Sequence, residues 1–268
     1  MTTAHFTKYY GAPGQAIGAA RHYGWLAAHA QPLQQPALIT AGPASLTFER
    51  IEGRHAEPQD LPRIASMLGD AHGAAWTSDL HQASLATPHA CRDDTWSLNG
   101  YVSCREAALR KRLEQGHLPD ASILDVLLTL VEETAQGPAA FYKDSNPRNF
   151  LITASGTVFT IDTDDLTLAP FGYDLAKLIT TLIMTYGSIE PPSIDQALDR
   201  YNEAAARHDA RLGTTDLQHL HAFVTLHIHL TAPYAGRNGY RFNVPDSEVT
   251  HDHDGTRLRP PWRGPVQR

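Results

Sequence analysis

The sequence predicts an α+β fold in two unequal parts, a small sheet with one helix followed by a larger and mainly helical part. Before residue 52, β-rich runs bounded by turn residues flank a single helical segment. Beyond residue 58, apolar residues recur at helical spacing over most of the chain. With 42% hydrophobic and 19% charged residues among 268, the composition excludes a disordered or collagen-like chain.

The N-terminal part is expected to hold three short strands and one helix. Aromatic and β-branched residues indicate the strands, and the turn Ala41-Gly42-Pro43 separates the second strand from the third. In chain order, the strand, the helix and the two further strands are predicted at residues 3–10, 14–30, 36–40 and 44–51. We place the boundary near residues 52–58 and assign residues 1–53 to an N-terminal lobe and 54–268 to a C-terminal lobe.

The C-terminal part is mainly helical with one β interruption. Helices are predicted near residues 59–74, 104–115, 120–135, 172–186, 193–208 and 215–232. Two β-rich runs, 150–153 and 157–161, surround the short loop Ala154-Ser155-Gly156 and predict a hairpin. Residues 73–103 and 233–268 read as irregular because they are rich in Pro, Gly, Asp and His.

Charge and cysteine content limit the function classes. The chain has 22 basic and 29 acidic residues, a net charge of −7, so we expect neither a nucleic-acid nor a membrane partner. The start of the chain has no signal-peptide pattern, and Cys91 and Cys104 fit no disulfide framework, which together predict a cytoplasmic protein. Four histidines in one helix, at 219, 221, 227 and 229, are interpreted as partly buried imidazoles rather than a zinc site. The oligomeric state stays open.

Polar residues that could carry chemistry stand at both ends of the predicted hairpin. Asp144 and Asn149 precede it and Asp162 follows it, and a hairpin brings its outer ends together. Asp144 and Asn149 alone could be an Asx-rich turn, but the combination with Asp162 favours a site. Magnesium accepts one or two protein oxygens together with phosphate oxygens, which Asn149 and Asp162 could provide. Asp144 would then be free to orient a hydroxyl for phosphoryl transfer.

These motifs resemble a known family. Residues 142–151, followed by a hairpin and Ile161-Asp162, are similar to the catalytic loop and metal-binding strand of kinases with the protein-kinase-like fold. Gly172-Tyr173-Asp174-Leu175-Ala176 matches the aminoglycoside phosphotransferase and choline kinase group within that fold. Residues 48–53 resemble that group's interlobe hinge, and residues 67–72 its following helix. The resemblance implies a two-lobed fold with a reduced N-terminal lobe.

The resemblance also implies roles for the motif residues. Asp144 becomes the base or hydroxyl-orienting residue, and Asn149 and Asp162 become the magnesium ligands. Asp174 becomes a buried brace for the catalytic loop.

Cofactor contacts follow in the same way. Lys8 resembles the strand lysine that contacts the nucleotide phosphates, and the backbone from Glu49 to Ile51 would contact the base. Lys143 and Arg148 are candidates to neutralise charge on the transferred phosphate. The implied cofactors are ATP, with GTP possible, and Mg2+; the implied partner is a small molecule with an acceptor hydroxyl.

Two features keep an alternative open. No acidic residue lies between Lys8 and Glu49 to pair with the lysine, and the strands and loop expected to cover the phosphates have no room before Lys8. Either the N-terminal lobe is reduced, or the true start of the protein lies upstream of Met1. The alternative function is a degenerate kinase-like protein that binds nucleotide or regulates without phosphotransfer.

The acceptor is the least constrained part of the hypothesis. An aminoglycoside or another antibiotic fits, because cationic groups could be bound by carboxylates at positions 79, 93, 94, 164 and 165. A nucleoside, a peptide antibiotic, an amino alcohol or a sugar satisfies the same argument.

Overall fold

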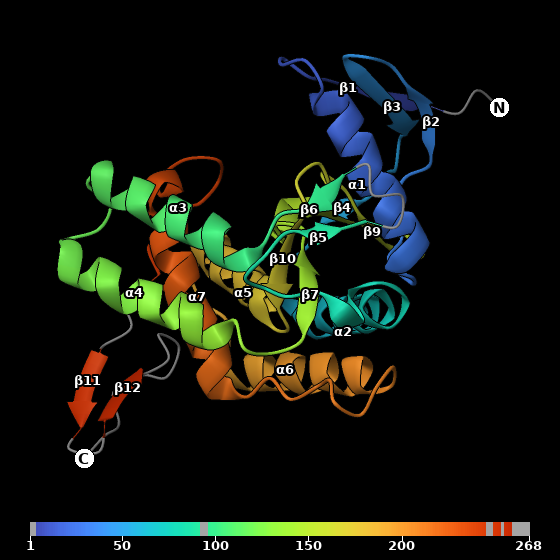
Figure 1. Cartoon of the computed structure of the whole chain (residues 1–268). Coiled ribbons are helices and arrows are strands. Elements are labelled where there is room, and N and C mark those ends of the chain that lie inside the picture. The colour runs from blue at the N-terminus through green and yellow to red at the C-terminus, as the bar shows by residue number, and fades with distance from the viewer. Residues whose placement is uncertain (1–3, 92–95, 245–248, 253–254, 259–268) are drawn as a thin grey trace.

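The computed structural model describes residues 4–91, 96–244, 249–252 and 255–258. The chain folds into two lobes of α+β character (Figure 1). Its helices are α1 (Gln15–His29), α2 (Leu61–Ser78), α3 (Tyr101–Glu114), α4 (Ala121–Thr134), α5 (Tyr173–Tyr186), α6 (Pro191–Ala206) and α7 (Leu217–Thr231). Each predicted helix is present, with ends that differ by a few residues from the prediction. Among the described residues, no helix combines the length and apolar character needed to cross a membrane.

The N-terminal sheet has three antiparallel strands. These are β1 (His5–Tyr9), β2 (Leu38–Ala41) and β3 (Ser45–Glu49), in the order β1-β3-β2. Helix α1 covers this sheet and contributes Trp25 and Leu26 to the buried core (Figure 1). Lys8 pairs with Leu46 in the register of β1 and β3, so the lysine belongs to an edge strand.

The chain changes sheets directly after β3. The next strand, β4 (Arg54–His55), pairs with β8 (Phe150–Ile152) rather than with the N-terminal sheet. Gly53 permits this crossing, because a Cβ at that position would lie 2.8 Å from the carbonyl oxygen of Ile152. Residues 50–53 therefore join the N-terminal sheet to the sheet of the predicted hairpin.

The hairpin forms from β8 and β9 (Val158–Thr160) in the predicted place. Phe150 pairs with Thr160 and Ile152 with Val158, and Gly156 takes a positive φ of 85° in the connecting loop. The amide of Thr160 also donates to the carbonyl of Gln34, 2.8 Å away, so the hairpin is tied to the segment after α1.

Several strands were not predicted. The strands β7 (Ala139–Tyr142) and β10 (Thr167–Pro170) pair with each other and flank, in sequence, the segment that carries the polar motif and the hairpin; two shorter hairpins are also present. Their strands are β5 (His89–Ala90), β6 (Ser97–Leu98), β11 (Val249–Asp252) and β12 (Gly255–Leu258). The prediction of irregular structure over 73–103 and 233–268 was therefore wrong in part. Strands of two to four residues are too short to show an alternating pattern, and alanine in β7 favours helix.

In the C-terminal lobe, α5 is buried along most of its length and α2 packs against α6. Every residue of α5 from Tyr173 to Met184 is buried. Helices α2 and α6 approach so closely that a Cβ on Gly69 would lie 2.2 Å from the carbonyl oxygen of Tyr201. The core is therefore rigid next to the segments that carry the polar motif.

Candidate active site

The loop between β7 and β8 carries the polar motif and is fixed by Asp174. The amide and hydroxyl of Ser145 donate to the two carboxylate oxygens of Asp174, each over 2.8 Å. Asp174 lies in the first turn of α5 and is fully buried. Burial raises the pKa of this carboxyl, against the nearby charge of Lys143 and the Ser145 hydrogen bonds. Asp174 thus has the bracing position that the resemblance implied.

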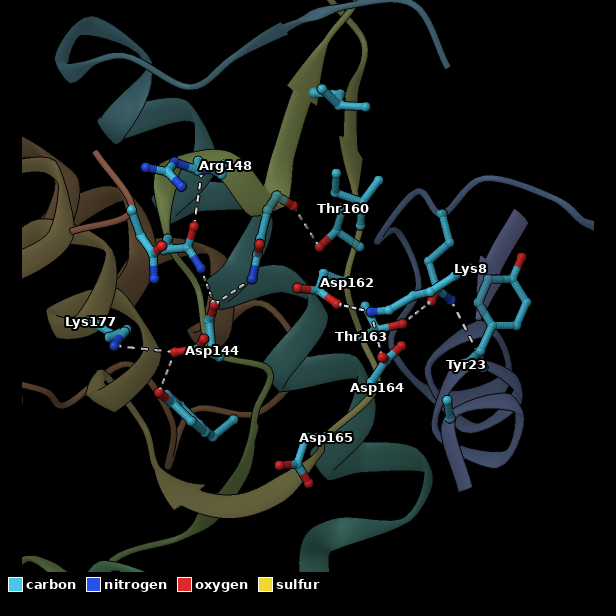
Figure 2. Close-up of a pocket in the computed structure, with 18 of the residues that line it drawn as sticks. Lys8, Tyr23, Asp144, Arg148, Thr160, Asp162, Thr163, Asp164, Asp165 and Lys177 are labelled. Atoms are coloured by element: carbon cyan, nitrogen blue, oxygen red, sulfur yellow. Dashed lines mark hydrogen bonds and ion pairs between the residues drawn. The ribbon is translucent and has the colours of Figure 1, made fainter. Parts of the chain in front are cut away.

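Asp144 projects from this loop into a cavity, with Lys177 beside it (Figure 2). The Lys177 Nζ lies 3.3 Å from Asp144 Oδ1, and the Tyr142 hydroxyl donates to the same oxygen over 2.7 Å. Burial alone raises the pKa of Asp144, but the charge of Lys177 and these hydrogen bonds hold it below its ordinary value. The carboxylate is consequently ionised at neutral pH and able to accept a hydrogen bond from a hydroxyl.

The hairpin brings Asn149 and Asp162 to one edge. The amide of Ile161 donates to the carbonyl of Asn149 over 2.9 Å, which extends the β8–β9 register by one pair. The side-chain amide of Asn149 donates to the backbone carbonyl of Asp144 over 2.9 Å. Asp144, Asn149 and Asp162 therefore come together, although only through the fold of the whole hairpin.

Lys8 reaches this edge from the other lobe. Its Nζ pairs with the carboxylates of both Asp162 and Asp164 (Figure 2). Partial burial lowers the pKa of Lys8, but the two carboxylates outweigh it and raise the pKa above its ordinary value. Asp164 also accepts a hydrogen bond from the Tyr10 hydroxyl over 3.0 Å. Asp164, which follows the hairpin, thus pairs with Lys8. Helix α1 has no acidic residue that could do so.

Lys143 and Arg148 occupy different environments. Lys143 is 1% exposed; its Nζ lies 4.3 Å from the centre of the Phe150 ring and has no hydrogen-bond partner in the described part of the chain. Burial lowers its pKa, against the charges of Asp174 and Asp144. Arg148 instead lines the cavity, with its guanidinium 5.9 Å from the Tyr240 ring centre. The structure therefore brings Arg148, but not Lys143, to the cavity that Asp144 enters.

The cavity lies between the two lobes and has a volume of about 1020 Å³. The N-terminal lobe and the segment after it contribute Lys8, Glu49 and Ile51 to its lining. The catalytic loop and the hairpin contribute Asp144, Arg148, Asn149 and Asp162. Of the residues predicted to be catalytic, nucleotide-binding or metal-binding, all but Lys143 line it.

A set of residues on one side of the cavity was missed by sequence reasoning. Lys177 follows Asp174 by three residues, and helical spacing could have placed both on one face of α5. Arg105, Tyr142, Tyr173 and His227 come from four different elements and carry no local signal. They meet only because β7 and the helices α3, α5 and α7 converge there.

Of the histidines of α7, His227 lines the cavity. His227 is buried and its Nε2 lies 3.0 Å from the carbonyl oxygen of Tyr173. Burial and the charges of Lys177 and Arg105 lower the pKa of His227 well below its ordinary value, so the ring is neutral. Across the described residues, no cluster of three or more His, Cys, Asp or Glu side chains forms a candidate metal centre.

A smaller donor set fits a hard cation bound jointly with phosphates. Because Asn149 uses its amide nitrogen on the Asp144 carbonyl, its oxygen remains the atom suited to a cation. The Asp162 side chain is 53% exposed and already attracts the ammonium of Lys8. One amide oxygen and one carboxylate are what Mg2+ accepts when phosphates and water complete its octahedron.

The carboxylates proposed for a cationic acceptor do not gather at one place. Asp79 lies outside the cavity lining, where it accepts a hydrogen bond from the Trp25 indole over 2.8 Å. Asp164 and Asp165 line the cavity, but Asp164 is paired with Lys8. Asp93 and Asp94 lie outside the described residues.

The chain is similar to a known protein family. The model of the phosphotransferase enzyme family matches residues 10–212. No curated protein matches the sequence.

Solved structures of low sequence identity share the fold. An amicoumacin kinase in complex with AMP-PNP, Ca2+ and Ami is 13% identical, with a TM-score of 0.56 over 87% of this chain and 75% of that one. Choline kinase from Cryptosporidium parvum Iowa II is 11% identical, with a TM-score of 0.56 over 88% of this chain and 77% of that one. An aminoglycoside-3'-phosphotransferase of type VIII is 18% identical, with a TM-score of 0.53 over 84% of each chain. At these identities the likeness concerns the fold alone.

Proposed function

The chain belongs to the phosphotransferase enzyme family, and on that premise we propose that it transfers the γ-phosphoryl group of ATP to a hydroxyl of a small molecule with the help of Mg2+. The observation that carries the proposal is the convergence of Asp144, Asn149 and Asp162 at one edge of the interlobe cavity. A positioned hydroxyl acceptor and oxygen ligands for a cation are the groups that phosphoryl transfer requires of a protein.

In this proposal Asp144 accepts the proton of the acceptor hydroxyl. The hydroxyl oxygen forms a bond to the γ-phosphorus while the bond from that phosphorus to the β–γ bridging oxygen breaks, and ADP leaves. The ion pair with Lys177 keeps Asp144 ionised, and the Asp174 brace fixes the loop from which it projects.

The charge of the transferred group is offset by cations of this chain. We assign this role to Lys8 and Arg148, which both line the cavity. Lys143 is not assigned it, because its ammonium lies against Phe150 behind the loop. Bound Mg2+, held by Asn149 and Asp162, would supply further neutralisation of phosphate charge.

The nucleotide base is assigned to the segment that joins the lobes. The cavity lining includes Glu49, Arg50 and Ile51, and beside them the aromatic rings of Tyr23 and Phe48. We accordingly propose residues 1–53 as the nucleotide-binding lobe and 54–268 as the catalytic and acceptor-binding lobe. Amicoumacin, choline and aminoglycosides are acceptors named for relatives in fold, and none is assigned to this chain by likeness.

Calorimetric titration of the chain with Mg·ATP and Mg·GTP tests the proposal. We expect metal-dependent binding in the wild type and its loss in Asp162→Asn. Asp162 has a positive φ of 59°, which asparagine tolerates, so this substitution removes the charge and preserves the backbone. Absence of nucleotide binding by the intact chain would overturn the proposal in favour of a degenerate, non-catalytic protein.

A further inference from the structure

One end of the cavity is built from α3, α5 and α7, beyond Asp144 as seen from the N-terminal lobe. We call this end the α3 pocket and define it by Arg105, Arg112, Tyr173, His227 and Tyr234, all of which line the cavity. In Figure 1, α3 and α7 lie on the opposite side of the C-terminal lobe from β1, β2 and β3. If the proposed function holds, the nucleotide occupies the N-terminal side and the acceptor occupies the α3 pocket.

Arg105 is a buried cation that has no anionic partner among the residues the structure describes. It is 9% exposed, and its guanidinium carbon lies 4.5 Å from the ring centre of Tyr142 and 5.0 Å from that of Tyr173. One terminal nitrogen donates to the Thr167 hydroxyl over 3.0 Å, while Nε has no hydrogen-bond partner. Within the described part of the chain, no carboxylate forms an ion pair with it. Burial of an unpaired charge is costly, so a bound anion at this position would be stabilising.

Arg112 adds a second cation on the same face of α3. It lies seven residues after Arg105, two helical turns along, and Ala108 between them also lines the cavity. Its Nε donates to the Leu230 carbonyl and one terminal nitrogen to the Gln115 side chain, each over 3.0 Å. Arg112, like Arg105, has no carboxylate partner among the residues that the structure describes.

Charge is thus divided between the two ends of the cavity. Asp162, Asp164 and Asp165 lie at the end reached by Lys8 (Figure 2). Asp144 also lines the cavity, but it is already engaged by Lys177 and the Tyr142 hydroxyl. A polycationic acceptor would meet two arginines without a compensating acid in this pocket.

We infer that the acceptor is a hydroxylated small molecule with an anionic group, a carboxylate or a phosphate, which Arg105 and Arg112 bind while its hydroxyl lies at Asp144. Guanidinium groups suit both anions because they donate paired hydrogen bonds in one plane. The exposed ring of Tyr234, 6.0 Å from the Arg112 guanidinium, offers a flat apolar face to the carbon skeleton of the acceptor. This inference rests on the proposed function and specifies its substrate class.

A set of sugars that differ mainly in charge tests the inference. Gluconate, glucose and glucosamine have closely related skeletons with negative, neutral and positive charge, and glucose 6-phosphate replaces the carboxylate by a phosphate. We expect one of the two anions to bind at least ~10-fold more tightly than glucose, and glucosamine to bind most weakly, because charge-assisted hydrogen bonds are lost. Stronger binding of gluconate assigns a carboxylate, and stronger binding of glucose 6-phosphate assigns a phosphate. Equal responses, no response to any of the four, or a preference for glucosamine would overturn the inference.

Two variants of α3 test whether the preference for an anionic sugar arises in the α3 pocket. Arg112→Gln should weaken binding of the preferred anion by ~10-fold to 100-fold and leave glucose unchanged, because one charged donor is removed. Arg110→Gln is the matched control, since Arg110 lies on the same helix and is exposed. Unchanged anion binding in Arg112→Gln would contradict the assignment.

The titrations are made with and without Mg·AMP-PNP, and binding of that nucleotide is measured separately. Failure of the nucleotide to bind counts against the proposed function, whereas nucleotide binding without an anion preference counts against this inference alone.

Discussion

Asp144 and Asp162 both have left-handed backbone conformations, each with a φ of 59°, and both project carboxylates into the interlobe cavity. For residues other than glycine this conformation costs of order 1 to 3 kcal/mol. Hydrogen bonds of neighbouring residues fix the backbone at both positions. Ser145, which follows Asp144, donates to Asp174, and Ile161, which precedes Asp162, donates to Asn149. Strain at both positions indicates that the direction of these carboxylates matters more than local stability.

Replacement of Asp144 by asparagine tests its role in turnover. Asparagine tolerates the same backbone conformation but cannot accept the hydroxyl proton, so kcat should fall by about 10²-fold to 10⁴-fold. Steady-state kinetics with an accepted substrate and calorimetry with Mg·ATP measure the two effects. Nucleotide binding should stay within a few-fold of wild type; unchanged turnover would remove the assignment of the base.

Asp164 is expected to position Lys8 in place of an acid on α1. Asp164→Asn leaves Lys8 with Asp162 as its remaining carboxylate partner, and we expect a KM for ATP raised by ~10-fold, as for the loss of one charge-assisted hydrogen bond. Asp165→Asn is the control, because Asp165 lines the same cavity without a contact to Lys8. The prediction fails if the two variants have the same KM for ATP.

The two lysines near Asp144 should differ in their effect on the pH profile. Lys177 is the leading charge that lowers the Asp144 pKa, and Lys143 contributes less. Lys177→Met should raise that pKa, so the acidic limb of kcat/KM should move to higher pH. Lys143→Met should move the acidic limb by less. Equal shifts in the two variants would contradict the prediction that Lys177 is the main cation acting on Asp144.

His72 makes the protein sensitive to acid. It is fully buried, with Nδ1 2.7 Å from the Tyr201 hydroxyl, and burial together with the charge of Lys143 lowers its pKa to about 3. From the ordinary pKa of ~6.5 down to that value, the unfolded chain binds a proton at this ring and the folded chain does not. The free energy of unfolding should therefore decrease by ~1.4 kcal/mol per pH unit below pH ~6.5 from this group.

Urea unfolding between pH 7 and pH 5 measures this slope. His227, whose pKa is lowered in the same direction, adds to the wild-type slope, so the comparison must be made between variants. His72→Asn retains a polar group near the Nδ1 position and should reduce the slope by about one proton, whereas the exposed His117→Asn should not. Identical slopes in all three proteins would contradict the prediction.

The sequence alone predicted the secondary structure of the segments in which several local signals indicate the same element. The hairpin, with its glycine-containing loop between β-rich runs, determined that Asn149 and Asp162 would meet, and the predicted helices were recovered to within a few residues. The position of Lys8 at the cavity was predicted from the resemblance of its short strand to the strand that carries the phosphate-contacting lysine in the kinase family.

The errors have physical causes. Strand β7 ends at Tyr142, and side chains alternate along an extended chain, so Lys143 faces Phe150 on the side opposite to Tyr142, which lines the cavity. Without β7 that alternation could not be used. Arg105 could not be foreseen either, because its environment is created by the rings of Tyr142 and Tyr173 from distant parts of the chain.

Residues 160–165 begin with the last residue of β9 in the C-terminal lobe, and several of their hydrogen bonds and ion pairs reach across to the other lobe. Thr160 bonds to Gln34, and Asp164 to Tyr10 and Lys8. The loop with Asp144 is instead bonded to α5 through Asp174. Asp144 is therefore held within the C-terminal lobe, whereas Asp162 lies in a segment that is bonded to both lobes, through Asn149 on one side and Lys8 on the other. A displacement of the N-terminal lobe would act on Asp162 through Lys8 and leave Asp144 on its α5 support, so the separation of these two carboxylates depends on both lobes.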